Sequence, residues 1–460
     1  MNAKHTKAAE RFLENKDHAA WHNQTLWFVR EKRDKVVKNV DEWEELRELA
    51  NQIKAHTISD LAKYLEEFAD NAKKNGIIVH WAKDAQEHNE IILGILQKHK
   101  AKKLAKSKSM LTEECHLNPF LIKNGIDVIE TDLGERILQL MDQPPSHIVM
   151  PAIHLKRQEV GVLFEEKLGT ETGNSDPTYL TRAARAHLRN EFLSADVGMT
   201  GVNFAVASTG DIVVCTNEGN ADMGTSLPKV QISTMGIEKV IPDHESLAVF
   251  LRLLARSATG QPITSYVSHF RKPAPGNEIN LVIVDNGRSD IVGNKSHVKT
   301  LYCIRCAACM NTCPVYRRTG GYSYEYFIPG PIGINLGMLK SPKKYHGDLA
   351  ACSLCMSCNN VCPVKIDLGQ QIYRWRQELD GLGLANASKE KLSAALNAVF
   401  VRPSLFYNAI KVGKMLKYIP RPFIYNGLND WGKGREIPTF AKESFNTLWK
   451  KGEIKKNKKL

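Results

Sequence analysis

Hydrophobic residues recur at helical spacing through the first part of the chain. Trp43, Leu46 and Ala50 would form one apolar stripe, and a second stripe runs over residues 61–68. Residues three and four apart lie on the same face of a helix, and an apolar face needs a surface to cover it. The pattern therefore predicts an N-terminal helical region, residues 1–72, that packs on the domain following it.

From residue 73 the pattern changes to short apolar runs that alternate with amphipathic stretches. The runs predicted to be strands are 76–82, 125–131, 147–153, 204–208, 211–216, 229–234, 239–242 and 279–284. The stretches predicted to be helices are 84–99, 112–123, 157–168, 177–194 and 243–256, with Asp84 and Asp243 as N-caps of the first and the last. Thr209-Gly210 separates two of the strand runs and predicts a hairpin turn. We expect residues 73–292 to form an α/β domain with a mostly parallel sheet and one hairpin.

Eight of the ten cysteines lie in two copies of the pattern C-x2-C-x2-C-x3-C-P. The first cysteine run comprises Cys303, Cys306, Cys309 and Cys313, and the second comprises Cys352, Cys355, Cys358 and Cys362. Three cysteines at this spacing can wrap one tight turn around a cubane iron–sulfur cluster. The fourth, one residue further on, points away toward a second cluster. The spacing therefore predicts two [4Fe-4S] clusters with crossed ligation.

In the predicted arrangement, cluster 1 is held by Cys303, Cys306, Cys309 and Cys362, and cluster 2 by Cys352, Cys355, Cys358 and Cys313. Zinc is the main alternative, but structural zinc favours two separated C-x2-C pairs in a tetrahedron. Disulfides are disfavoured because the chain shows no secretory signal. Cysteines concentrated in this way suit a reducing compartment, so we expect a cytoplasmic protein.

Residues 293–385 are expected to form this ferredoxin-type domain, which is α-helical outside the cysteine runs. The insert over 314–351 is rich in aromatic residues, glycine and proline, and we predict an ordered loop over the clusters. Helices are predicted for 368–379 and for 388–416, the second with a break near Pro403. Residues 386–460 are therefore expected to be a helical extension that ends in a basic tail.

The 460-residue chain carries 63 Lys and Arg against 50 Asp and Glu, a net charge of +13. The basic residues are scattered and accompany no reader motif, which argues against nucleic-acid binding. The sequence contains no run of about 18 apolar residues, so it predicts no transmembrane segment. Peripheral membrane contact is kept as an alternative. Arg305, Arg317 and Arg318 lie beside cluster ligands, where they either raise a cluster's potential or are simply solvated.

Two polar patches follow predicted strands of the α/β domain. The candidate ligand-binding residues in them are Lys106, Lys108, Ser109, Asn217, Glu218 and Asn220. Ligands of open α/β sheets bind beyond the carboxyl ends of the strands, so these patches predict a site for an anionic ligand or a partner. The alternative is a turn in which Asn and Gly serve only the backbone.

Other familiar motifs are absent. Gly219–Ser226 resembles a phosphate loop, but Thr225 stands where the lysine is required. No G-x-G-x-x-G opens a helix after a strand, so a dinucleotide site of that type is not predicted. The histidines are dispersed, and none pairs along the sequence with an acid in a way that marks a catalytic set.

The segments KSKSM (106–110), VGMTGVNFAVASTGDIVVCTNEGN (197–220) and GPIG (330–333), together with the cysteine runs, closely resemble the bacterial lactate utilisation protein B family. The resemblance covers essentially the whole chain. It implies that the α/β domain is of the lactate-utilisation type, related to sugar-phosphate isomerase-like proteins. It also implies two companion proteins, a cysteine-rich-repeat subunit and a lone α/β-domain subunit, that act with this chain to convert L-lactate to pyruvate. The family often has an acidic residue before the hairpin Thr-Gly, where this chain has Ser208.

We therefore expect a non-catalytic iron–sulfur subunit that relays electrons through two clusters to an unidentified acceptor. The electrons would come from a partner's substrate site or from the chain's own α/β domain. One alternative is an iron–sulfur redox sensor, which needs a single labile cluster and an output surface. Another is an electron relay for a different 2-hydroxy acid dehydrogenase.

Overall fold

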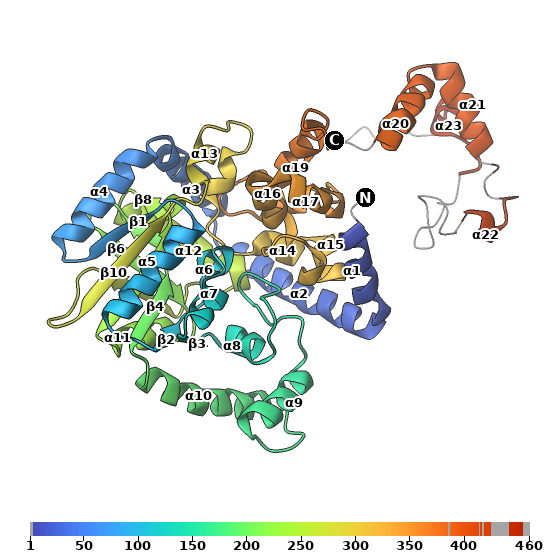
Figure 1. The fold of residues 1–460 in the computed structure, drawn as a ribbon. Helices are drawn as coiled ribbons and strands as arrows, with labels where there is room; N and C mark the ends of the chain where they lie inside the picture. Colours follow the sequence, from blue (N-terminus) through green and yellow to red (C-terminus); the bar gives the residue numbers. More distant parts are fainter. Residues whose placement is uncertain (1–2, 385–386, 414, 416–417, 425–440, 454–460) are drawn as a thin grey trace. The chain divides into compact units, whose positions relative to one another are not determined.

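The computed structural model describes residues 3–384, 387–413, 415, 418–424 and 441–453 (Figure 1). Contacts divide the chain into two compact units, Met1–Leu379 and Asp380–Leu460. The first unit contains two sheets and both cysteine runs, and the second contains only helices among its described residues. No helix in the described ranges is long and apolar enough to cross a bilayer.

A six-stranded parallel sheet forms the centre of the first unit (Figure 1). Its strands, in spatial order, are β1 (Ile78–Ala82), β10 (Glu278–Val284), β7 (Val230–Gly236), β4 (Val197–Gly201), β2 (Lys103–Lys106) and β3 (Asp127–Glu130). The α/β prediction is thus confirmed. Because all six strands are parallel, their carboxyl ends meet at one edge, where ligands of such sheets bind.

The predicted hairpin belongs to a second, four-stranded sheet. The order in this sheet is β8 (Val240–Ile241), β5 (Phe204–Val206), β6 (Asp211–Thr216) and β9 (Tyr266–Phe270). β5 and β6 pair antiparallel with Val206 opposite Asp211. Gly210 between them has φ +74°, the left-handed conformation that such a turn needs.

Helices and the second sheet cover the two faces of the parallel sheet. One face packs against α5 (Ala85–Lys98) and α7 (Leu117–Lys123). The other face packs against the second sheet, α12 (His244–Thr259) and, toward β2 and β3, α10 (Pro177–Leu193). The shorter or peripheral helices are α6 (Met110–Glu114), α8 (Leu133–Leu140), α9 (Arg157–Leu168), α11 (Asn220–Ser226), η1 (Ile237–Lys239) and α13 (Arg288–Val292). Asp84 and Asp243 cap α5 and α12 as predicted, each accepting a bond from a first-turn N–H.

The predicted N-terminal helices are present as α1 (Ala3–Glu14), α2 (Lys16–Val37), α3 (Trp43–Ser59) and α4 (Leu61–Lys74). α4 lies on the α/β domain, where Asn71 Nδ2 donates to the Ala207 carbonyl (2.9 Å). α1 and α2 instead lie beside the cysteine-run region (Figure 1), and Asn51 of α3 donates to the Val364 carbonyl (2.7 Å). The expectation that these helices pack on the following domain is therefore incomplete, because they join both regions into one unit.

The strand predicted over 147–153 is wrong. His147 Nδ1 accepts bonds from the backbone N–H groups of Val149 (3.1 Å) and Met150 (3.0 Å), which curls the segment into turns. Two real strands, β4 and β9, were not predicted, and β2 was expected only as a strand end at the polar patch 106–109. β2 is four residues long, β4 contains two glycines and β9 has two polar residues among five, so none shows a clear apolar pattern.

The insert between the cysteine runs is ordered as predicted, but it is largely helical rather than a loop. Over residues 298–378, which include the insert and both cysteine runs, the elements are η2 (Val298–Tyr302), α14 (Ala308–Thr312), α15 (Pro314–Thr319), η3 (Gly321–Ser323), α16 (Gly330–Lys340), α17 (Pro342–Tyr345), η4 (His346–Ala351), α18 (Ser357–Val361) and α19 (Leu368–Glu378). Pro331 lies in the first turn of α16, where its missing N–H breaks no helical bond. Pro331, one of the prolines that suggested a loop, therefore lies at the start of a largely buried helix.

The second unit contains α20 (Ala387–Phe400), α21 (Pro403–Gly413), α22 (Arg421–Ile424) and α23 (Phe445–Lys450). The helical region predicted for 388–416 and its break at Pro403 are confirmed over the described residues. Residues 454–460 of the predicted basic tail lie outside the described residues.

Candidate functional site

The two cysteine runs converge, and all eight cysteines have free thiols. Burial, followed by the nearby Cys362 thiol, raises the pKa of Cys306. Burial likewise raises the pKa of Cys313 to about 11, with Cys352 and Cys355 adding to the shift. The two runs also meet directly, because the hydroxyls of Thr312 and Ser357, next to Cys313 and Cys358, lie 2.6 Å apart.

The backbone around the thiols is unusual in the same way in both runs. Arg305 and Ala307 have φ +62°, and Leu354 and Met356, at the matching positions, have φ +54° and +58°. Each such residue costs about 1–2 kcal/mol in the left-handed region, so the surroundings must stabilise this path. The path directs the N–H of Arg305 to Cys303 Sγ (3.4 Å) and that of Leu354 to Cys352 Sγ (3.3 Å). Free thiols with converging N–H donors fit an anionic iron–sulfur cluster.

Arginines from distant helices secure the carbonyl groups of the second run. Arg47 of α3 donates to the Cys362 carbonyl through Nε (3.0 Å) and Nη2 (2.9 Å). Arg376 of α19 donates through Nη2 to the carbonyls of Cys352 (2.5 Å) and Leu349 (2.6 Å). These bonds hold the loop without occupying any sulfur.

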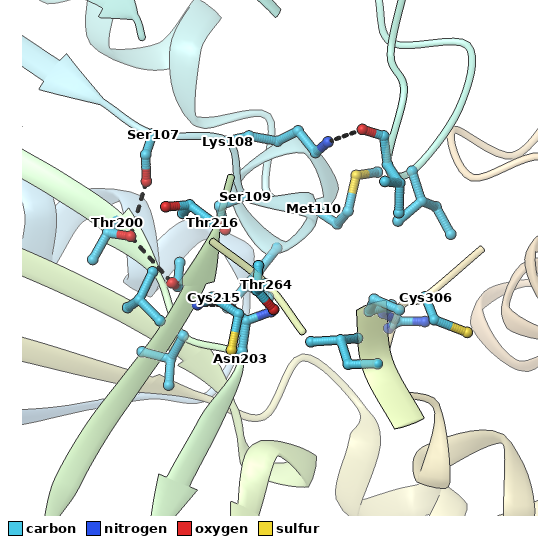
Figure 2. Close-up of a pocket in the computed structure, with 18 of the residues that line it drawn as sticks. Ser107, Lys108, Ser109, Met110, Thr200, Asn203, Cys215, Thr216, Thr264 and Cys306 are labelled. Atoms are coloured by element: carbon cyan, nitrogen blue, oxygen red, sulfur yellow. Dashed lines mark hydrogen bonds between the residues drawn. The ribbon is translucent and has the colours of Figure 1, made fainter. Parts of the chain in front are cut away.

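A cavity of about 250 Å³ lies between the strand ends and the first cysteine run. Figure 2 shows Ser107, Thr200 and Thr216 on the strand side and Cys306 on the opposite side, with its sulfur directed away from the strands. Five of the six candidate ligand residues line this cavity, namely Lys108, Ser109, Asn217, Glu218 and Asn220. Folding thus brings together two polar patches that are about 110 positions apart in the sequence.

The sixth candidate, Lys106, lies outside the cavity lining. Its side chain is 1% exposed, and its Nζ lies 2.5 Å from Glu130 Oε1 and 3.7 Å from Glu113 Oε1. A buried ammonium held by two carboxylates stabilises β2 against its neighbours and is not available to a ligand.

Residues of the two polar patches line the cavity. Lys108 Nζ donates to the Val149 carbonyl (2.9 Å), as Figure 2 shows, and Asn217 Nδ2 donates to Gln261 Oε1 (3.0 Å). Glu218 accepts a bond from the Leu133 N–H (3.1 Å). Burial, with Asp132 nearby, raises the pKa of Glu218 to about 7, so its charge changes near neutral pH.

An ionic network also lines the cavity, and it was not predicted. Arg288 pairs with Glu238 (Nε to Oε2, 2.7 Å) and with Glu114 (Nη2 to Oε2, 2.7 Å). Burial opposes ionisation of Glu238, but Arg288 and its cationic neighbours outweigh it and lower the pKa to about 2. Gly236 makes room, because a Cβ there would lie 2.1 Å from Glu238 Oε2. In the sequence, the signal for this network was the adjacent pair Glu238-Lys239, which follows the strand predicted at 229–234.

The three arginines next to cluster ligands have different surroundings. Arg305 is largely buried and lines the cavity, with Nη2 3.8 Å from Glu238 Oε1. Arg317 stacks on the Trp27 ring with its guanidinium carbon 4.4 Å from the ring centre. Arg318 is exposed to solvent. Only Arg305 connects a cysteine run to the cavity.

The fold also assembles a histidine group that sequence spacing concealed. His244 Nε2 lies 3.1 Å and His269 Nδ1 lies 3.6 Å from Asp211 Oδ2, and possible ligand atoms of all three lie within 4.8 Å of one another. Arg271 Nε, 3.4 Å from the other Asp211 oxygen, already supplies a cation there. Antiparallel pairing of β6 with β9 brings Asp211 and His269 together, and His244 comes from the first residue of α12.

Comparison with known proteins separates the two regions of the first unit. Residues 65–291 match the LUD domain family, and residues 299–366 match the 4Fe-4S dicluster domain family. A solved structure of a DUF162 family protein from Deinococcus radiodurans covers 49% of this chain and 98% of its own, with 15% identity and a TM-score of 0.28.

Curated relatives match over nearly the whole length. Lactate utilization protein B of Oceanobacillus iheyensis is 41% identical over 88% of this chain and 87% of its own. The protein of the same name from Anoxybacillus flavithermus is 43% identical over 91% of both chains. That from Macrococcus caseolyticus is 49% identical over 68% of this chain and 66% of its own. Since these matches span the α/β domain and both cysteine runs, the chain belongs to the lactate utilization protein B family.

Proposed function

We propose that this chain is the iron–sulfur electron-transfer subunit of a system that oxidises L-lactate to pyruvate. Its relatives are named for lactate utilization, and its matched families include a 4Fe-4S dicluster domain. The observation that carries the proposal is the convergence of the two cysteine runs, in which the hydroxyls of Thr312 and Ser357, next to Cys313 and Cys358, lie 2.6 Å apart.

The proposed ligands of cluster 1 are Cys303, Cys306, Cys309 and Cys362, and those of cluster 2 are Cys352, Cys355, Cys358 and Cys313. Each bound cluster would supply one-electron transfer. The protein holds the thiolates at fixed positions, directs N–H groups to the sulfurs and keeps water from Cys306, Cys309, Cys358 and Cys362, which are all under 9% exposed. Oxidising L-lactate to pyruvate releases two electrons and two protons, and two one-electron centres match that number.

The test is an anaerobic preparation of the full chain with its companion proteins, comparing wild type with Cys306→Ala and Cys115→Ala. Cys115 is a buried cysteine outside both runs, so its variant controls for losing a buried thiol. We expect about eight irons and eight sulfides in wild type and Cys115→Ala, and loss of lactate oxidation only in Cys306→Ala. Circular dichroism checks that the variants fold. Unchanged lactate oxidation in folded Cys306→Ala, or zinc in place of iron in wild type, would contradict the proposal.

We further propose that the second unit docks the two companion lactate-utilisation proteins. Its helices α20 and α21 and the turn between them carry apolar side chains that are exposed to solvent, including Leu392 (55%), Phe400 (59%) and Val401 (66%). Apolar surface of this extent marks a protein or membrane contact. Deleting residues 380–460 should abolish co-purification of the companions while the iron content stays unchanged, because all eight cysteines lie in the other unit. Companions that still bind the shortened chain would rule out this surface.

A further inference from the structure

The cavity has excess positive charge beside the first cysteine run. Both carboxylates of the ionic network, Glu114 and Glu238, are engaged by Arg288. Arg305 reaches Glu238 only at 3.8 Å, and its buried Nη1 has no hydrogen-bond partner among the described residues. Lys239, which also lines the cavity, has no ion pair or hydrogen bond within the described part of the chain. Arg288, Arg305 and Lys239 thus face two carboxylates in this part of the cavity, and the one positive charge in excess favours an anion.

A neutral polar group adds a second requirement for a ligand. The Thr216 hydroxyl is buried at the cavity wall and has no partner among the described residues. Ser109 lines the same cavity. A buried hydroxyl without a partner costs about 1–3 kcal/mol, so a ligand oxygen there would be stabilised.

We propose that this cavity binds a small carboxylate with an oxygen on the neighbouring carbon, a 2-hydroxy or 2-oxo acid. Lys239 and Arg305 hold its carboxylate, and Thr216 bonds its second oxygen. The choice of acid rests on the proposed lactate function, whereas the anion site rests on the charges alone.

The size and apolar surface of the cavity fit such a ligand. One water needs roughly 10–15 Å³ of comparable space, so about 250 Å³ admits an acid of a few carbons together with water. Val202, Val214 and Leu254 supply apolar wall for a short alkyl group. The site lies next to Cys306, so the ligand would sit beside the first cysteine run rather than the second.

One rival assignment uses the same cations. Cys303 raises the pKa of Arg305, after the opposing effect of burial, so its thiolate lies within the field of that guanidinium. In the rival view, Lys239 and Arg305 only balance the charge of the first run and no ligand enters the cavity. The two views differ in whether a soluble carboxylate binds.

The test uses the full chain, prepared anaerobically with its iron, and isothermal titration with L-lactate, pyruvate and neutral lactamide. Lys239→Gln removes the proposed anchor, and Lys239→Arg preserves its charge. Lys229→Gln is the matched control, because exposed Lys229 lies before the start of β7 while Lys239 lies beyond its end. We expect both acids to bind and lactamide not to bind. Lys239→Gln should weaken acid binding at least tenfold, and Lys239→Arg and Lys229→Gln should stay within about twofold of wild type.

Failure of either acid to bind wild type would overturn the proposal, as would equal binding by Lys239→Gln and Lys229→Gln. An electron paramagnetic resonance change in Lys239→Gln without any acid binding by wild type would establish the rival. The outcome is separable from the proposed function. Clusters that reduce normally in a chain that binds no acid would leave the relay intact, whereas acid binding by a chain without clusters would remove the relay and keep the site.

Discussion

The two cysteine runs share one spacing but differ in their surroundings. In the first, Cys306 and Cys309 are each 8% exposed, and Arg305 and Cys306 border the cavity. In the second, Cys355 is exposed, and arginines of α3 and α19 hold the carbonyls. The cysteine spacing determines which cluster a run can bind. The surroundings of the run determine with which groups that cluster can exchange electrons. Within the proposed relay, the first run serves the cavity side and the second serves the external acceptor.

The largest expected effect separates a buried ligand from an exposed one. Cys309→Ala should lower the Tm of the iron-loaded chain by roughly 10 °C, because it removes a thiol from the packed core. Cys355→Ala should lower it by only a few degrees, since solvent can approach that position. Differential scanning calorimetry under anaerobic conditions, with iron assays, measures both. Equal losses would show that the two runs do not differ in the way described.

The anchoring of the second run can be broken without touching a thiol. Arg47→Ala leaves the Asn359 carbonyl without its side-chain donor and leaves the Cys362 carbonyl with only the Lys365 N–H (3.3 Å). We expect a loss of about 1–3 kcal/mol in the free energy of unfolding, the cost of one buried group without its partner. Anaerobic urea denaturation measures it. An unchanged midpoint would mean that the run is held by its cysteines alone.

The cavity side predicts a pH dependence. Glu218 is neutral below its pKa of about 7 and charged above it, with Asp132 raising and Lys108 lowering that pKa. Its added negative charge should weaken carboxylate binding between pH 6 and pH 8, and Lys239, whose pKa burial lowers to about 8, loses part of its charge over the same range. Glu218→Gln should remove the Glu218 contribution, leave a fall of about twofold from Lys239, and keep the affinity at pH 6 nearly intact. Titration calorimetry at both pH values measures the carboxylate affinity. An equal change in affinity between pH 6 and pH 8 in variant and wild type would exclude Glu218 as a source of the pH dependence.

The smallest expected effect is at the surface beside the second run. Lys365 Nζ lies 2.9 Å from Glu48 Oε2, and both side chains are partly exposed. Lys365→Ala should cost at most about 1 kcal/mol, because water screens such a pair. The same urea experiment measures it and serves as the control for Arg47→Ala. A loss as large as that of Arg47→Ala would mean that charge, not burial, secures this run.

Local patterns in the sequence predicted much of the molecule. The cysteine spacing, the caps Asp84 and Asp243, the hairpin at Thr209-Gly210 and most helices depend on residues a few positions apart. Such features can be recognised because their physics is local. The positions of the two polar patches after strands were also predicted, since parallel strands end at a common edge.

Only the tertiary structure decided which of these groups meet. Lys106 and Lys108 are two positions apart, yet burial against Glu130 removes one from the cavity and leaves the other in it. Arg288, Glu238 and Glu114 form one network although more than 170 positions separate the outer two. Sequence distance carries no information about such pairs, because their energy depends on burial and on contacts that exist only after the sheets and helices have packed.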